Sequence, residues 1–160
     1  MGRDLSLWTF AVTAYARPGV EEICLTLQDA FGQNVALLLW RLWALDRPIG
    51  PVALDAATAV ARTCEGRILA PLRQVRRGLR APIDGVVDDA REALRESVRR
   101  AELGAERLLL DALEAATPPS ASGARADPTA ALTELAQRWG ASATPTLLGR
   151  LAAAVGSATG

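Results

Sequence analysis

Two glutamates offer the most specific chemistry in this chain. Glu102 and Glu106 are four residues apart, so they lie on the same face of a helix. Carboxylate pairs of this kind bind metal ions in helical bundles, where histidines complete the set of ligands. The sequence contains no histidine, so we predict neither a metal site nor a cofactor. A cluster of these glutamates with Arg73 or Arg77 fits better, and we interpret both glutamates as structural polar anchors that fix the register of the helices.

Arginines dominate residues 62–80, which hold six of them against one glutamate, and the following residues 84–96 are acidic. One interpretation is a surface for phosphate or nucleic acid. The other is an antiparallel pair of helices whose opposite charges match. The formal net charge is zero, the pI is about 6.3 and no nucleic-acid-binding motif is present, so we predict no nucleic-acid binding. Arg73, Arg76 and Arg77 stay candidates for a clamp on a small anionic ligand.

Aromatic side chains are concentrated near the start of the chain. Trp8, Tyr15 and Trp43 each combine an apolar ring with a polar tip, which suits ligand pockets and interfaces. Core packing is the simpler explanation, and a pocket or a partner groove between helices is the alternative. We therefore treat these three residues as candidate contacts for a ligand or a partner.

Neither cysteine is surrounded by the groups that a catalytic thiol needs. Cys24 is followed one turn later by Gln28, which is neither a base nor a cation. The charges of Glu65 and Arg67, next to Cys64, nearly cancel. The chain also lacks glycine-rich phosphate loops and the sequence patterns of serine hydrolases and zinc proteases. We predict that the protein is not an enzyme and has no catalytic residue.

The elements that must position these residues are helices. Apolar residues do not alternate anywhere with the period of two that a half-buried strand requires. Their spacing predicts helices from about residue 4 or 6 to 17, at 18–31 and at 35–45. The third is apolar nearly all round, so we expect it to be central and buried. A fourth helix begins near Val52, and Pro71 should kink or split it.

Gln28 and Asp29 lie at the end of the second predicted helix. An aspartate near a helix C-terminus opposes the helix dipole by some tenths of a kcal/mol, so it needs a compensating partner. We expect that partner to be an arginine or the free N–H groups that open the next helix after Asn34. We therefore interpret Gln28 and Asp29 as structural polar anchors at this corner.

The strongest periodic signal covers residues 83–116. Apolar residues recur there at positions 83, 87, 90, 94, 98, 101, 105, 108 and 112, which predicts a helix of about 50 Å. A linker follows at 117–128, and two short helical segments lie beyond it, either docked or loosely held. We predict an all-α bundle of five to six helices over 1–116, with the long helix as its spine and 129–160 as a short C-terminal helical appendage.

Three stretches carry a family pattern: LWTFAVTAYARPGVEEICLTLQDAFGQNVALLLWRLWA, then PLRQVRRGLR, then RRAELGAERLLLDAL. The matching residues of the first stretch are Trp8, Tyr15, Pro18, Gly19, Cys24, Gln28, Asp29 and Gly32. Together the stretches resemble a family of short proteobacterial proteins of unknown function. The resemblance covers about residues 5–115. It implies a small soluble helical domain and carries over no activity, cofactor or partner.

Two functional hypotheses follow from the missing catalytic groups and the many apolar helix faces. The first is a non-catalytic cytoplasmic module that acts through protein–protein contacts, as an adaptor or accessory subunit. The alternative is a helical bundle that binds an apolar or anionic small molecule through an aromatic pocket and an arginine clamp. A pocket of a few hundred Å³ would favour the second, and a solid core with an exposed apolar patch the first. No apolar run approaches about 18 residues, so we predict no membrane span.

Overall fold

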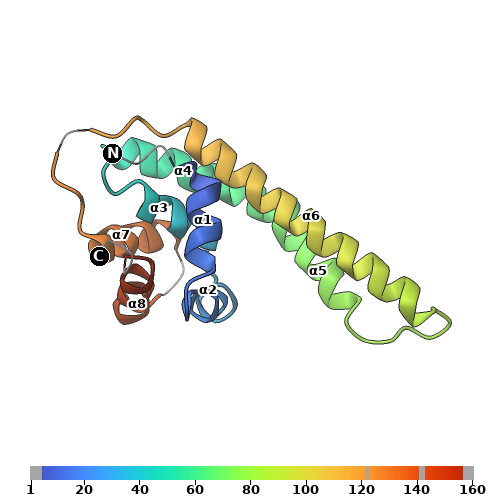
Figure 1. Cartoon of the computed structure of the whole chain (residues 1–160). Helices are drawn as coiled ribbons and strands as arrows, with labels where there is room; N and C mark the ends of the chain where they lie inside the picture. Colours follow the sequence, from blue (N-terminus) through green and yellow to red (C-terminus); the bar gives the residue numbers. More distant parts are fainter. Residues whose placement is uncertain (1–4, 122, 141–142, 157–160) are drawn as a thin grey trace.

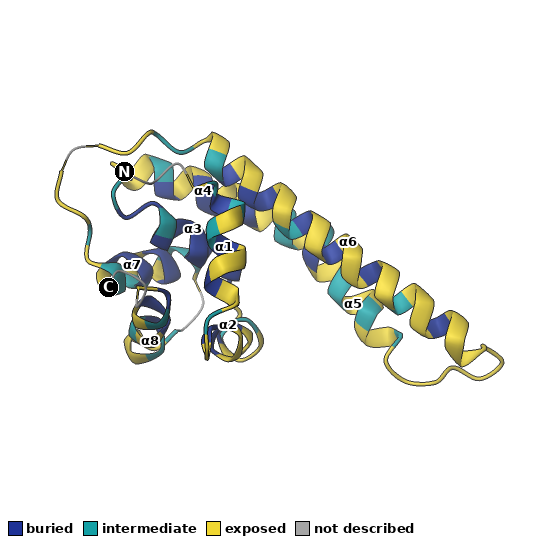
Figure 2. Ribbon diagram, in the orientation of Figure 1, coloured by how far each residue is buried: buried dark blue, intermediate teal, exposed yellow. Residues whose placement is uncertain are grey.

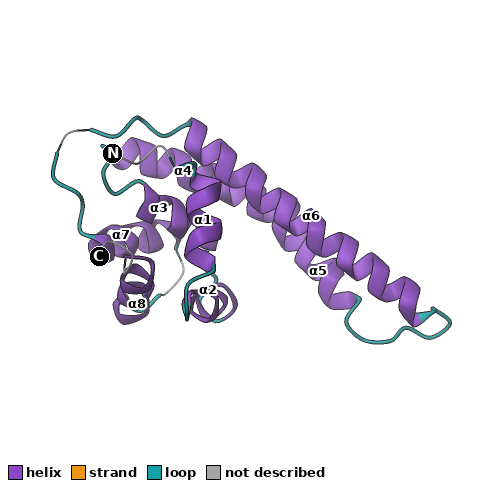
Figure 3. Ribbon diagram, viewed as in Figure 1, coloured by secondary structure: helices purple, strands orange, loops and turns teal. Residues whose placement is uncertain are grey.

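The computed structural model describes residues 5–121, 123–140 and 143–156. Its elements are α1 (Leu7–Tyr15), α2 (Val20–Asp29), α3 (Val35–Trp43), α4 (Pro51–Cys64), the π-helical stretch η1 (Glu65–Leu69), α5 (Ala70–Gly78), α6 (Asp88–Ala115), α7 (Pro128–Trp139) and α8 (Pro145–Gly156). None of the described residues forms a strand (Figure 3). The predicted all-α bundle, with one long helix and a short helical C-terminal part, is confirmed.

The molecule consists of a head and an arm (Figure 1). The head contains α1–α4, α7, α8 and the C-terminal half of α6. The arm is formed by α5 and the first half of α6, which run antiparallel away from the head and are joined by the loop 79–87. Buried residues concentrate in the head, whereas most of the arm is exposed (Figure 2). Within the described ranges, no helix is both long and apolar enough to cross a membrane.

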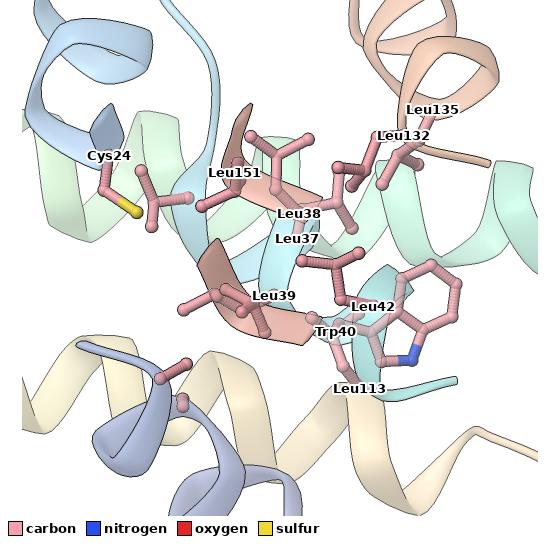
Figure 4. Close-up of a cluster of buried hydrophobic side chains, with 14 of the residues drawn as sticks. Cys24, Leu37, Leu38, Leu39, Trp40, Leu42, Leu113, Leu132, Leu135 and Leu151 are labelled. Carbon is pink, nitrogen blue, oxygen red and sulfur yellow. The ribbon is translucent and has the colours of Figure 1, made fainter. Parts of the chain in front are cut away.

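The centre of the head is α3. Seven of its nine residues are buried, and it packs against α1, α6 and α7. Asn34 caps its start, because the side-chain Oδ1 accepts a hydrogen bond from the N–H of Leu37 at 2.9 Å. Figure 4 shows the leucines of α3 among side chains of α7 and α8. The prediction of a central, buried helix is therefore confirmed.

The C-terminal helices are docked on the head. α7 packs against α3, and α8 packs against α2. Four of their leucines belong to the same buried core as α3: Leu132, Leu135, Leu148 and Leu151. Arg62 of α4 donates to the carbonyls of Arg138 and Trp139, at 3.1 and 2.7 Å. These carbonyls end α7, where intrahelical donors are lacking. The sequence left open whether this segment is docked, and both apolar and polar contacts now place it on the head.

α4, η1 and α5 form one continuous rod in spite of Pro71. A proline cannot donate the N–H that an α-helix requires inside its length. The helix widens immediately before it, and the N–H of Ala70 bonds to the carbonyl of Glu65, five residues back. The predicted kink or split therefore takes the form of a π-helical stretch that keeps the helix unbroken.

The long helix begins at Asp88, five residues later than predicted. The preceding chain closes a turn in which the N–H of Val86 donates to the carbonyl of Ile83 at 3.0 Å. Gly85 within this turn has a φ of 80°, a left-handed conformation that favours glycine. Apolar spacing cannot reveal such a turn, because Ile83 and Val86 keep the helical period while they lie in a loop.

The face that α6 buries also differs from the predicted stripe. Leu94 and Leu108, which belong to that stripe, are about half exposed. The buried positions are Arg91, Val98, Glu102, Ala105, Leu109, Leu110 and Leu113. Arg91 donates to two carbonyls at the end of α5, and Glu102 forms an ion pair with Arg76. The stripe is displaced because α6 faces α5 partly through charged side chains, which a pattern of apolar residues omits.

Candidate functional site

A cavity of about 520 Å³ lies where the head meets the arm. Its lining comes from α1, the α2–α3 corner, the η1–α5 segment and the middle of α6. Most of the lining is apolar, for example Val35 and Leu39 of α3 and Leu103 and Leu110 of α6. Polar side chains interrupt this lining at a few positions. This combination is typical of a small-molecule site.

α1 forms one wall because its residues divide between two helical faces. Leu7 and Ala14 are buried in the core. Trp8, Val12 and Tyr15 follow a spacing of four and three residues, so they share another face. All three line the cavity. The short helix therefore supplies core packing on one side and the aromatic wall of the cavity on the other.

A chain of hydrogen bonds joins two polar residues of the cavity wall. Asn34 donates through Nδ2 to Oε2 of Glu65 at 3.2 Å. Arg73 donates through Nη1 to Oε1 of the same carboxylate at 2.5 Å. Asn34 and Arg73 line the cavity. Because the Glu65 carboxylate is shared between them, the charge of Arg73 is already balanced within the protein.

The π-helical stretch makes the pairing of Glu65 with Arg73 possible. Residues eight apart on a regular α-helix point about 80° away from each other. A π turn accommodates one extra residue and rotates the following helix back toward the same face. The stretch lies between these two residues. It therefore brings together Glu65 and Arg73, which regular α-helical spacing would separate.

Glu106 is the carboxylate of the cavity wall, and it also borders an adjoining hollow of about 420 Å³. It is partly buried and makes no hydrogen bond or ion pair with any residue that the structure describes. Burial raises its pKa; Arg73 opposes this shift, and the negative charges of Glu102 and Glu65 add to it. Glu106 therefore holds its proton more tightly than an ordinary glutamate.

Tyr15 and Cys24 form a second polar contact beside the cavity. The Tyr15 hydroxyl and the Cys24 thiol lie close enough for each to influence the pKa of the other. Burial raises the pKa of the Cys24 thiol to about 12, although the neighbouring Tyr15 hydroxyl acts in the opposite direction. The pKa of Tyr15 is raised by burial and, to a smaller extent, by the nearby Cys24 and Glu106. Both groups are protonated at neutral pH, so the thiol is not a nucleophile there.

The structure brings three of the six predicted contact residues together. Trp8, Tyr15 and Arg73 line the cavity. Trp43 lies elsewhere: its indole N–H donates to the carbonyl of Leu5 at 2.9 Å. Arg76 borders the adjoining hollow and pairs with a glutamate, and Arg77 is exposed on α5. The three arginines therefore do not converge on one ligand position.

The four predicted polar anchors lie in different surroundings. Glu102 pairs with Arg76 at 2.6 Å, and Glu106 and Gln28 line the cavity. Asp29 is exposed, and the hydrogen bond described for it comes from the Gln28 amide at 3.4 Å. The expected partner, an arginine or the start of α3, is not the one observed.

The reason is that backbone groups at the end of α2 and at the start of α3 form their hydrogen bonds without Asp29. Asn34 caps α3 with its own side chain. Gly32, with a φ of 60°, turns the chain so that the N–H of Gln33 reaches the carbonyl of Leu27 at 3.0 Å. Asp29 is therefore left at the surface.

Sequence reasoning missed several residues of the cavity. Leu103 and Leu110 flank Glu106 at spacings of three and four, so they share its helical face. The sequence signal for these residues was the placing of two leucines on either side of a glutamate on one helical face. Leu69, in contrast, reaches the cavity from the π-helical stretch. Its direction depends on that irregular turn, and no sequence pattern indicated it.

The fold and the cavity define an all-α protein with a mainly apolar site at the junction of two helical regions. The family model described as "Protein of unknown function (DUF2390)" matches residues 6–113, well over half of the chain. The chain therefore belongs to this family, which agrees with the resemblance seen in the sequence. The matched range contains every residue that lines the cavity and ends before α7. Searches of the curated proteins and of the solved structures find no match.

Proposed function

We propose that this protein binds a small, mainly apolar molecule in the cavity between head and arm, without catalysing a reaction. The observation that carries the proposal is the cavity itself. Its volume of about 520 Å³ lies within the usual range of roughly 300–1,000 Å³ for small-molecule sites. Apolar walls would supply most of the binding free energy, and the polar residues would orient the ligand.

The cavity favours ligand binding over the adaptor role that the sequence favours. An adaptor needs an apolar patch that is open to a partner. Here Val12 and Leu103, which are exposed apolar residues, border a concave site instead of a flat surface. The proposal also does not depend on an arginine clamp, because Arg73 is paired with Glu65. A protein partner and a cytoplasmic location stay predictions.

A neutral reporter dye tests the proposal. N-phenyl-1-naphthylamine fluoresces strongly in apolar surroundings, so we expect a saturable rise in its emission on addition of the protein. Val12→Phe places a larger side chain at the cavity and should weaken dye binding by about tenfold or more, a change of about 1.4 kcal/mol. Val75→Phe on α5 is the matched control, because the two valines are 50% and 49% exposed and Val75 does not line the cavity.

The control variant should bind the dye as the unchanged protein does. Circular dichroism should show the same helix content for both variants. Absence of saturable dye binding to the unchanged protein, or an equal loss in Val12→Phe and Val75→Phe, would contradict binding in this cavity.

A further inference from the structure

The charge balance around the cavity points to the class of ligand. Resting on the proposed function, we infer that the ligand is an apolar molecule with a cationic head group, such as a primary amine, and that the Glu106 carboxylate holds this head group. Glu106 lines the cavity and lacks a hydrogen-bonding partner among the described residues. An ammonium group would supply the missing donor and form a charge-assisted hydrogen bond.

Both nearby arginines are already paired with carboxylates of the protein. Arg73 donates to Glu65 at 2.5 Å, and Arg76 donates to Glu102 at 2.6 Å. An anionic head group would compete with these carboxylates for the charge of the arginines and would also meet the charge of Glu106. The two arginines and three glutamates leave one excess negative charge when Glu106 is ionised. The cavity therefore selects against anions and for cations.

The aromatic wall provides a second surface for a cation. The ring of Trp8 already faces a cation, because the Arg107 guanidinium lies 5.1 Å from its centroid. Rings of this kind attract positive charge through their electron-rich faces. Tyr15 lies on the same wall, and a tyrosine hydroxyl oxygen can accept a hydrogen bond from an ammonium. Glu106, Tyr15 and Trp8 thus combine an anion, an acceptor and an aromatic face around one cavity.

Other charged groups border the adjoining hollow together with Glu106. They are Glu21 of α2, Arg76 of α5, and Glu96, Arg99, Arg100 and Glu102 of α6. Arg76 pairs with Glu102, and Arg99 pairs with Glu96 at 3.5 Å. Arg100 donates to Ser97 at 3.1 Å. These internal contacts leave Glu106 without an arginine of its own.

The burial of Glu106 makes cation binding dependent on pH. Its pKa is raised above the ordinary value for glutamate, so the neutral carboxyl group persists to a higher pH than it does in an ordinary glutamate. An ammonium group pairs with the ionised form, and binding therefore releases a proton. Affinity for the cation should rise as pH rises through the titration of Glu106 and then level off. A neutral ligand should show no such dependence.

Three competitors with one apolar body and different head groups test the inference. They are 1-naphthylmethylamine, 1-naphthylmethanol and 1-naphthoate, each displacing N-phenyl-1-naphthylamine from the protein. We expect the amine to compete about tenfold better than the alcohol, and the carboxylate to compete least. Glu106→Gln should remove the advantage of the amine and leave the affinity for the alcohol unchanged. Glu22→Gln, which alters an exposed glutamate of α2 that lines neither the cavity nor the adjoining hollow, should keep that advantage.

The outcomes separate the two proposals. Dye binding together with equal competition by amine and alcohol, or with a preference for the carboxylate, would overturn the cationic ligand and leave the binding site standing. An equal loss in Glu106→Gln and Glu22→Gln would overturn the role of Glu106. Failure of the unchanged protein to bind the dye or any competitor would overturn both. Unchanged dye affinity in Glu106→Gln shows that this variant keeps the folded cavity.

Discussion

The head and the arm are held together by different interactions. The head has a core of leucines from α3, α7 and α8 around Trp40. In the arm, α5 has no buried residue, and its contact with α6 relies on the pair Arg76–Glu102 and on Arg91. Apolar burial is additive and insensitive to direction, whereas these polar contacts depend on the position of each atom. The two regions should therefore respond differently to the same kind of substitution.

The largest difference is expected from truncating a leucine in each region. Leu132 of α7 is fully buried and Leu94 of the arm is 53% exposed. Leu132→Ala should lower the free energy of unfolding by about 3 kcal/mol through lost contacts and a cavity. Leu94→Ala should change it by no more than about 0.5 kcal/mol. Urea unfolding followed by circular dichroism measures both, and similar losses would contradict the contrast between head and arm.

A smaller effect is expected from breaking the charged contact of the arm. Arg76→Leu leaves the largely buried Glu102 without its partner and should cost about 1–2 kcal/mol, since Arg76 itself is partly exposed to water. The double variant Arg76→Leu with Glu102→Leu removes both charges and should recover most of this loss. A double-mutant cycle in urea gives the coupling free energy. A double variant that is less stable than Arg76→Leu would show that the unpaired Glu102 carboxylate does not cause the loss.

The pH dependence of stability gives a weaker but specific signal at the junction. Glu106 has a raised pKa in the folded protein, so its contribution to stability is fully present below the unfolded pKa of about 4.5 and is lost as pH rises through the folded pKa. Glu106→Gln removes this loss. The variant should therefore gain stability relative to the unchanged protein between acidic and neutral pH. A difference between the two proteins that stays constant over this range would contradict the raised pKa.

The smallest effect is expected from an exposed ion pair of the arm. Arg99 and Glu96 are 3.5 Å apart, and both side chains are more than half exposed. Arg99→Ala should change the free energy of unfolding by less than about 0.5 kcal/mol, because water and salt screen such pairs. A loss comparable to that of Arg76→Leu would show that burial does not distinguish the two pairs.

Sequence patterns predict the individual helices of the head better than the contacts between them. The buried helix α3 and the Asn34 cap follow from local residue types, since an unbroken apolar surface must be covered wherever it lies. The docking of α7 and α8 depends on contacts distant in sequence. The N–H of Ala126, in the predicted linker, donates to the carbonyl of Leu45 at 2.9 Å. Nothing in a composition of proline, serine and alanine indicates that contact.

The residues of the cavity can also be predicted only in part, because residue type is local and the contacts between helices are not. Trp8, Tyr15 and Arg73 are candidates by residue type, and the cavity brings them together. Glu65 acts on the cavity only because the π-helical stretch turns Arg73 toward it. The burial of Arg91 likewise depends on carbonyls at the end of another helix. Patterns of apolar residues carry no information on such polar contacts.

The rod of α4, η1 and α5 is also a lever, because it belongs to both regions. Its α4 part is fixed to α7, because Arg62 of α4 donates to the last carbonyls of α7. Its pivot is the π-helical stretch, where Leu69 touches the cavity. The nine residues of α5 extend about 14 Å beyond that pivot. A bend of about 5° there would move the far end of α5 by roughly 1 Å, so a small change in the shape of the cavity is magnified along the arm.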